Sequence, residues 1–137
     1  MAPAAHHFCA RMSALADLLA CARTACRAAH VEGHVMRRIE LVLEELFTNT
    51  VRHGYGGDCE ASVWLQTNQT GAGLCITYED AAPAYNPLTH EVDLDHSASN
   101  HPPGGLGVHL ARCLADEIAY RRDEGRNVVT LCFRTSP

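Results

Sequence analysis

Lysine is absent from this sequence of 137 residues, so that all eleven basic residues are arginines, and the formal net charge is −5. A chain with so little positive charge lacks a broad surface for contacting nucleic-acid phosphates. The absence of lysine also excludes a lysine Schiff base and a Walker-type lysine that holds phosphates. We therefore expect no nucleic acid among the direct partners.

Cysteine pairs with CxxC spacing and long apolar runs are missing as well. The cysteines are odd in number, and we expect them to be unpaired, small, buried side chains in a reducing cytoplasm; they are Cys9, Cys21, Cys26, Cys59, Cys75, Cys113 and Cys132. The N-terminus lacks the basic start and apolar stretch of a signal peptide. No apolar run is long enough to cross a bilayer, which predicts a soluble, cytoplasmic protein without a membrane partner.

The length and the apolar content of 47% suit one compact domain over residues 1–137. Hydrophobic periodicity predicts helices at 8–29, 34–53 and 106–116. Alternating patterns predict strands at 59–67, 74–79, 117–122 and 128–134. Between them, residues 80–103 contain four prolines and show no sustained periodicity, as is typical of a functional lid or a disordered loop. Helices gathered on one face of a mixed, mostly antiparallel sheet predict an α+β fold, a two-layer sandwich.

The predicted helix at 34–53 carries a polar stripe. At about 100° per residue, Glu45, Asn49 and His53 follow one another at one-turn spacing along the margin of the apolar face. Polar groups at such a margin are half-buried and need partners. The stripe is either a solvated boundary or a pocket wall, in which a carboxylate and a carboxamide hold a hydroxyl and Mg²⁺ side by side. The helix is expected to stop at Gly54, in the left-handed conformation that favours glycine.

Asp80 ends a predicted strand and is followed by small residues that include Ala82 and Ala84. A carboxylate in that position can accept a hydrogen bond from an exocyclic amine, and the small residues leave room for a flat ring. A plain turn-initiating aspartate is the commoner alternative.

A glycine-rich segment, PGGLGVH at residues 103–109, directly precedes the third predicted helix. Glycines let the backbone come close to a ligand, and a helix N-terminus offers unpaired N–H groups to an anion. The candidate anion-binding residues are Gly104, Gly105, Leu106, Gly107 and Val108. An ordinary tight turn is the alternative.

Taken in this order, the stretches EELFTNTVRHGY, EDAAPAYNPL and GGLGVHLARCLADEIAYRRDEGRNVVTL resemble the N, G1 and G2 boxes of the GHKL ATPase superfamily. The pattern is most similar to the anti-sigma-factor serine/threonine kinases of the RsbW/SpoIIAB type. The likeness covers roughly residues 10–134 and implies a Bergerat-type, histidine-kinase-like ATP-binding fold. Its members use Mg²⁺ and ATP.

The resemblance implies a role for each residue of the stripe. Glu45 would be the general base or the carboxylate that positions the nucleophile. Asn49 would bind Mg²⁺ and bridge it to the phosphates, and His53 would line the phosphate side of the pocket.

The resemblance also assigns the two ends of the nucleotide. Asp80 would accept from the adenine amino group, beside Ala82 and Ala84. Asn127 would be a polar partner of the adenine region, where many relatives have threonine. The glycine segment would hold phosphates under an ATP lid at about 88–103.

Members of this branch phosphorylate a STAS-domain antagonist, bind a sigma factor when free, and often form homodimers. This chain departs from the family pattern at Ala82, where glycine is usual, at Asn127, and in a lid without Arg or Lys. These departures leave open a second function, that of a catalytically weak or nucleotide-independent module that acts by sequestering partners.

A sensor histidine kinase fragment and a metal-binding protein fit the sequence less well. The kinase fragment would carry a dimerisation helix pair ahead of this domain, yet the domain pattern begins almost at residue 1. A metal-binding lid would use a cluster without HExxH spacing, namely His90, Glu91, Asp93, Asp95, His96 and His101.

Overall fold

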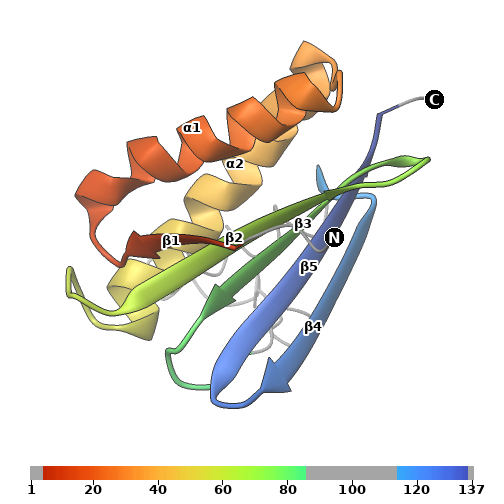
Figure 1. The fold of residues 1–137 in the computed structure, drawn as a ribbon. Helices are drawn as coiled ribbons and strands as arrows, with labels where there is room; N and C mark the ends of the chain where they lie inside the picture. The colour runs from red at the N-terminus through yellow and green to blue at the C-terminus, as the bar shows by residue number, and fades with distance from the viewer. Residues whose placement is uncertain (1–4, 86–113, 136–137) are drawn as a thin grey trace, which may run out of the picture.

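The computed structural model describes residues 5–85 and 114–135 of the chain (Figure 1). The N-terminal half begins with strand β1 (His6–Cys9), the 3₁₀ turn η1 (Met12–Ala14), helix α1 (Leu15–Ala28), helix α2 (Gly33–Asn49) and the π-helical turn η2 (Thr50–Gly54). The remaining elements are strands β2 (Ser62–Gln69), β3 (Gly73–Asp80), β4 (Glu117–Asp123) and β5 (Arg126–Arg134).

The strands form one sheet in the order β1-β2-β3-β5-β4, and every pairing among the described strands is antiparallel. Figure 1 shows α1 and α2 side by side on one face of this sheet. The predicted α+β two-layer sandwich is confirmed. Its sheet was expected to be mixed and mostly antiparallel, and all pairings among the described strands are antiparallel. No helix in the described ranges combines the length and hydropathy that a membrane span requires.

The core lies between the two layers because each layer has one apolar face. Helix α2 contributes Val35, Ile39, Val42, Leu43, Leu46 and Phe47, all buried. The inward residues of the sheet alternate with outward ones, and the buried set includes Val63, Leu65, Leu74, Ile76, Leu131 and Phe133. Burying each such side chain contributes about 1.5–3 kcal/mol, so the apolar stripe of α2 fixes which of its faces turns inward.

The N-terminal segment differs from its prediction. A helix was expected from residue 8, but residues 6–9 form the edge strand β1, which pairs with β2 from His6↔Leu65 to Cys9↔Ser62. The helix α1 begins only at Leu15. Four residues are too few to show strand alternation, and the pairing with β2 is a long-range contact that local periodicity does not contain.

The other boundaries shift by a few residues. Strand β2 runs over Ser62–Gln69 instead of 59–67, and the hairpin turn is correspondingly shorter, closed by the Thr70 hydroxyl accepting from the Gly73 amide at 3.0 Å. The turn between β4 and β5 is confirmed, with positive φ at Glu124 and Gly125 as a two-residue hairpin requires. The predicted helix at 106–116 falls almost entirely outside the described residues.

The prediction that Gly54 adopts a left-handed backbone conformation is also wrong. The positive φ angles in this region belong to Gly56 and Gly57, whereas Gly54 closes the turn η2. Glycine is needed at position 54 for a different reason, a close approach to Ala82 that is described below.

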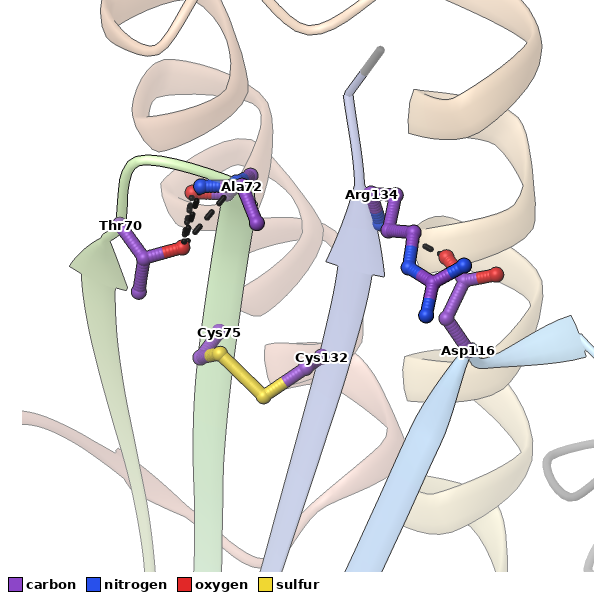
Figure 2. The surroundings of a disulfide bond; sticks show 7 residues. Thr70, Ala72, Cys75, Asp116, Cys132 and Arg134 are labelled. Carbon is purple, nitrogen blue, oxygen red and sulfur yellow. Dashed lines mark hydrogen bonds between the residues drawn. A yellow bond between two sulfur atoms is a disulfide. The ribbon is translucent and has the colours of Figure 1, made fainter. Parts of the chain in front are cut away.

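The expectation of unpaired cysteines is wrong for Cys75 and Cys132, which form a disulfide between β3 and β5 (Figure 2). The two residues are 57 positions apart in the chain, and only the register of β3 and β5 places them opposite each other. The free cysteines among the described residues are Cys9, Cys21, Cys26 and Cys59, of which Cys26 is buried.

Candidate functional site

The end of helix α2 is tied to the end of strand β3 by a short hydrogen-bonded chain. The hydroxyl of Thr50 donates to Asp80 Oδ2 at 2.8 Å, and the Tyr78 and Thr50 hydroxyls are 2.7 Å apart. All three side chains are buried. Thr50 directly follows Asn49 in the sequence. These hydrogen bonds therefore hold Asn49, the predicted metal ligand, and Asp80, the predicted adenine acceptor, at the same end of the molecule.

The Asp80 carboxylate is nearly saturated by neutral donors. Oδ2 accepts from Thr50, while Oδ1 accepts from Asn127 Nδ2 at 2.8 Å and from the Ala82 amide at 3.1 Å. Two carboxylate oxygens offer about four lone-pair positions. One position on Oδ2 therefore remains for a further donor, such as an exocyclic amine, on a side chain that is 8% exposed.

Asn127 lies opposite Asp80 in the register of β3 and β5, and its amide group is fully used within the protein. Besides Asp80, its Nδ2 donates to the carbonyl of Pro83 at 3.0 Å. Its Oδ1 accepts from the Tyr85 amide at 3.0 Å and from the Tyr120 hydroxyl at 2.7 Å. Asn127 thus positions the loop at 81–85, which is a different task from the direct adenine contact that the resemblance implies.

Further side chains hold the same loop from two sides. The Tyr55 hydroxyl accepts from the Ala81 amide at 2.7 Å and donates to the Ser62 carbonyl at 3.0 Å. Arg122 Nη1 donates to the Ala82 carbonyl at 2.8 Å. Sequence reasoning missed these positioning residues, which are Thr50, Tyr55, Tyr78, Tyr120 and Arg122. Most of them act through a partner distant in sequence, and Tyr120 acts through Asn127 on the paired strand. No local pattern marks such residues.

The alanine at position 82 fits because its neighbour is a glycine. Ala82 is 2% exposed, and a Cβ built on Gly54 would lie only 2.9 Å from the Ala82 methyl. The Ala82 methyl group therefore packs against the end of η2. The space that it occupies is free because Gly54 has no side chain.

This packing predicts a coupled pair of substitutions. Gly54→Ala should lower the free energy of unfolding by about 1–3 kcal/mol, because an added methyl group would overpack the contact with Ala82. Gly54 does not have a positive φ, so the backbone itself tolerates alanine. Urea unfolding of the single and double variants measures the effect.

Ala82→Gly is the matched partner, since it removes the methyl group that Gly54→Ala would meet. In the double variant the cost of Gly54→Ala should shrink by at least about 1 kcal/mol. An equal cost of Gly54→Ala in both backgrounds would contradict the proposed contact.

The polar stripe of α2 is partly as predicted. Glu45 and Asn49 are half-buried and one turn apart, and the neighbouring Glu44 is exposed. His53 is exposed and lies in η2, where the Tyr55 amide donates to the Thr50 carbonyl at 2.8 Å. This i→i+5 bond widens the turn, so His53 leaves the straight continuation of the stripe. Its role on the phosphate side stays a prediction.

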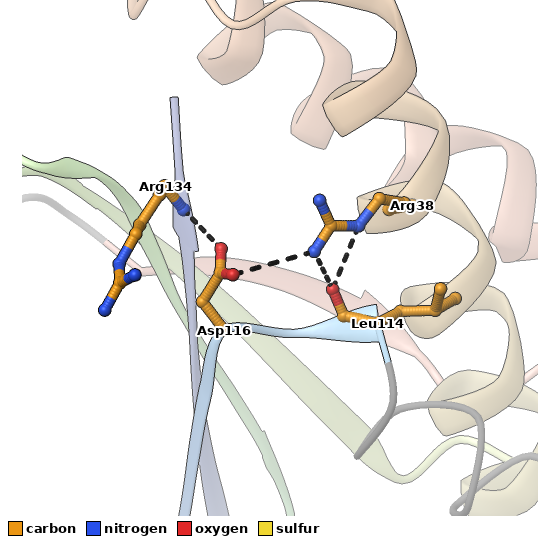
Figure 3. A network of polar contacts seen from close by, with 4 residues as sticks. All are labelled: Arg38, Leu114, Asp116 and Arg134. Atoms are coloured by element: carbon orange, nitrogen blue, oxygen red, sulfur yellow. Dashed lines mark hydrogen bonds and ion pairs between the residues drawn. The ribbon is translucent and has the colours of Figure 1, made fainter. Parts of the chain in front are cut away.

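Residues 114–116, which lead into β4, are bound to α2 and β5 by a polar network (Figure 3). Arg38 Nε donates to the Leu114 carbonyl at 3.0 Å, and a second bond comes from Nη2. The same Nη2 lies 3.9 Å from Asp116 Oδ1, and Asp116 Oδ2 accepts from the Arg134 amide at 2.7 Å. This network fixes the start of β4, just as the loop at 81–85 is fixed after β3.

Several predicted site residues lie outside the described residues. They are the lid at 88–103, its histidine and acidic cluster, and the glycine segment Gly104, Gly105, Leu106, Gly107 and Val108. Within residues 5–85 and 114–135, no group of three or more His, Cys, Asp or Glu side chains is arranged to hold a metal ion. Ala84 is described and exposed, in the loop that Asn127 holds.

Tyr78 stays protonated in this site. Burial raises its pKa well above the ordinary value of 10, the nearby Asp80 adds to the rise, and the hydrogen bond with Thr50 opposes it. A protonated Tyr78 donates to Thr50, which leaves the Thr50 hydrogen for Asp80. Each hydroxyl in the series therefore donates toward the carboxylate, from Tyr78 to Thr50 and from Thr50 to Asp80.

The raised pKa of Tyr78 predicts a loss of stability in alkali. A tyrosine whose folded pKa lies above its unfolded pKa stabilises the fold below about pH 10, and that contribution disappears as the pH rises further. Tyr78→Phe should remove up to about 1.4 kcal/mol per pH unit from the slope of unfolding free energy above pH 10. It should cost about 1 kcal/mol at neutral pH for the lost hydrogen bond. Denaturant unfolding from pH 7 to 11 tests both; identical slopes above pH 10 would contradict the assignment.

Comparisons with known proteins support the fold described above. The family model of the histidine kinase-like ATPase domain matches residues 8–133. The serine/threonine-protein kinase BtrW of Bordetella bronchiseptica is 28% identical over 100 residues, which are 72% of this chain and 70% of that protein.

Two solved structures share the fold. The RsbU and RsbW domains of a Mycobacterium tuberculosis protein align with a TM-score of 0.62 and 18% identity, over 98% of this chain and 33% of that one. The SiaB–SiaC complex of Pseudomonas aeruginosa gives a TM-score of 0.58 and 12% identity, over 93% and 87% of the two chains. This chain thus spans about a third of the Mycobacterium chain, and at these identities the likeness establishes the fold alone.

Proposed function

Because the chain belongs to the histidine kinase-like ATPase domain family, we propose that it is a protein serine/threonine kinase that uses Mg²⁺ and ATP. The observation that carries this proposal is the hydrogen bond from Thr50 to Asp80, which holds Asn49 and Asp80 at one end of the fold. A relative named as a serine/threonine-protein kinase supports the same activity.

The loop at the proposed adenine end is held by hydrogen bonds before any ligand binds. Asp80 keeps one lone-pair position for the exocyclic amine, and the small residues Ala82 and Ala84 border the ring. The backbone of this loop is held by Asn127, Tyr55 and Arg122. A loop that is already ordered loses little conformational entropy on binding, which favours affinity.

The phosphate end uses the stripe on α2. Asn49 offers an amide oxygen, a hard donor that suits Mg²⁺, and Glu45 stands one turn before it with a half-buried carboxylate. When bound, the metal supplies positive charge that neutralises the transferring phosphoryl group. The glycine segment from Gly104 to Val108 would hold phosphate oxygens through its backbone N–H groups.

In the proposed reaction, a serine or threonine hydroxyl of the partner attacks the γ-phosphorus. Glu45 accepts the hydroxyl proton as the new P–O bond forms and the bond to the β–γ bridging oxygen breaks, so that ADP leaves. Phosphoryl transfer depends mainly on positioning and charge neutralisation, so this small set of groups suffices.

The proposed substrate is a STAS-domain antagonist in an anti-sigma partner-switching system of the cytoplasm, with a sigma factor as the alternative partner. This identification rests on the resemblance of the three motifs to the RsbW/SpoIIAB branch. A homodimer fits the same branch. The competing proposal is a sequestering module without kinase activity, favoured by the absence of Arg and Lys from residues 88–103.

The experiment is a transfer assay with the purified protein, γ-labelled ATP and a STAS-domain protein from the same source. Label should appear on one serine or threonine of the partner, with Mg²⁺ and not with EDTA. Calorimetric titration with ATP runs in parallel. Binding of ATP without transfer would favour the sequestering module, and no binding of ATP at millimolar concentration would overturn the kinase proposal and leave the nucleotide-independent form of the sequestering module.

A further inference from the structure

The disulfide between Cys75 and Cys132 lies at a position that the proposed kinase chemistry does not use. The two cysteines are direct cross-strand partners on β3 and β5, with a Cα–Cα distance of 4.1 Å. Figure 2 shows the bond bridging the two strands, near the turn that carries Thr70 and Ala72. Asp80 lies five residues further along β3, or about 17 Å at the rise of an antiparallel strand.

The sulfur atoms lie on the face of the sheet opposite the helices. On β3 the inward residues Ile76 and Tyr78 are buried, whereas Cys75 alternates with them and is half-buried. Figure 1 shows α1 and α2 on the other face, and no described helix covers this one. The partners that flank the pair across the sheet, Asn68 on β2 and Glu117 on β4, are both exposed. Small solutes can therefore reach the pair.

The strand pairing holds the two residues together whether or not the bond exists. Close Cα atoms mark a pair of the non-hydrogen-bonded kind, in which the side chains face each other most closely. The ladder extends to both sides of the pair, from Gly73↔Arg134 to Asp80↔Asn127. Opening the bond then needs rotation of two side chains and no change in the strand register.

We propose that Cys75 and Cys132 form a reversible thiol–disulfide site, closed by low-molecular-weight disulfides and opened by dithiols. This inference is independent of the proposed kinase activity. In a reducing medium the pair is a dithiol, and in an oxidising one it is the cross-link seen here.

The closing step consists of two thiol–disulfide exchanges. One cysteine thiolate attacks the small-molecule disulfide, forms a mixed disulfide and releases one thiolate. The second cysteine thiolate attacks the sulfur of the first, which releases the second small thiolate and forms the Cys75–Cys132 bond. Two electrons pass from the cysteine pair to the small disulfide, and the two thiol protons end on its two thiol products.

The cross-link should act on stability more than on the nucleotide site. It joins residues separated by 57 positions, so it restricts the unfolded chain strongly. For a domain of this size we expect the oxidised protein to melt roughly 10 °C above the reduced one. The ladder between the pair and Asp80 is unchanged, so ATP affinity should differ by less than about twofold.

The experiment incubates the full chain in its folded state with defined ratios of oxidised and reduced glutathione, with no denaturant. Alkylation and peptide mapping by mass spectrometry then report the fraction of Cys75 linked to Cys132. That fraction should follow the glutathione ratio reversibly, from either direction, and the melting temperature should follow the fraction.

Cys75→Ser and Cys132→Ser should each remove the dependence of the melting temperature on glutathione. Cys21→Ser, which alters a half-buried free cysteine of α1, should keep it. A Cys75–Cys132 bond that exchanges only in denaturant, or a pair that never links, would overturn the proposal. A melting temperature that depends on glutathione equally in the Cys75→Ser variant would also overturn it.

Discussion

Replacing Asn49 with alanine is expected to weaken magnesium-dependent ATP binding by roughly 100-fold or more while the protein stays folded. The reason is chemical: the variant loses the amide oxygen that we assign to the metal. Even the loss of a group that only supports a metal ligand costs about 10–100-fold in metal affinity. Calorimetric titration with ATP, with and without Mg²⁺, measures the effect.

Asn49 is half-buried at the last residue of α2, so its truncation should change the free energy of unfolding by no more than about 1 kcal/mol. Two variants sharpen the test. Asn49→Asp keeps an oxygen ligand and should retain metal-dependent binding, and Asn68→Ala removes an exposed amide from β2 and should change nothing. Full magnesium-dependent binding by Asn49→Ala would remove Asn49 from the site.

Glu45→Gln is expected to slow phosphoryl transfer by about 10²–10⁴-fold, the usual contribution of a positioned general base, while ATP binding is retained. Glutamine has nearly the shape of glutamate and cannot accept the hydroxyl proton. The measurement is single-turnover transfer from Mg-ATP to the partner, with ATP affinity determined on the same sample.

The adjacent glutamate provides the matched control. Glu44 carries the same charge on the same helix but is exposed, whereas Glu45 is half-buried at the margin of the apolar face. Glu44→Gln should therefore transfer phosphate at the wild-type rate. Equal transfer rates for Glu45→Gln and Glu44→Gln would exclude Glu45 as the proton acceptor.

Two departures from the motif pattern that the sequence resembles have local partners in the structure. Ala82 replaces a glycine, and Gly54 leaves space for its methyl group. Asn127 stands where threonine is common, and its larger amide ties the loop at 81–85 to Asp80. Both residues hold the loop at 81–85 next to the proposed adenine end of the site. We expect nucleotide binding to tolerate these departures, and the absence of Arg and Lys from residues 88–103 then becomes the feature that bears on transfer.

The positions of Glu45, Asn49 and Asp80 could be predicted because local patterns carry them. A helix with a one-sided apolar stripe has only one face that can be buried, so the margin of that face follows from residue spacing alone. The hairpin of β2 and β3 was visible for a similar reason, since strand alternation and a polar turn are both local.

The missed features depend on partners far away in the chain. Strand β1 exists because β2 offers it an edge, and Gly54 is glycine because Ala82 approaches it. The loop at 81–85 is held by Tyr55, which precedes it in the sequence, and by Asn127, which follows it. Residue spacing contains none of these distances.

The amino-acid order alone was sufficient for the α+β class, the apolar face of α2 and the polar stripe beside it. These are properties of short segments, and periodic burial determines them. The order of the three motifs is also read from the sequence, and it carries the resemblance to the family. Tertiary structure decided that Thr50 joins Asp80, that Asn127 holds the loop and that Cys75 faces Cys132. Each of these contacts depends on the register and packing of elements that are brought together only when the whole chain folds.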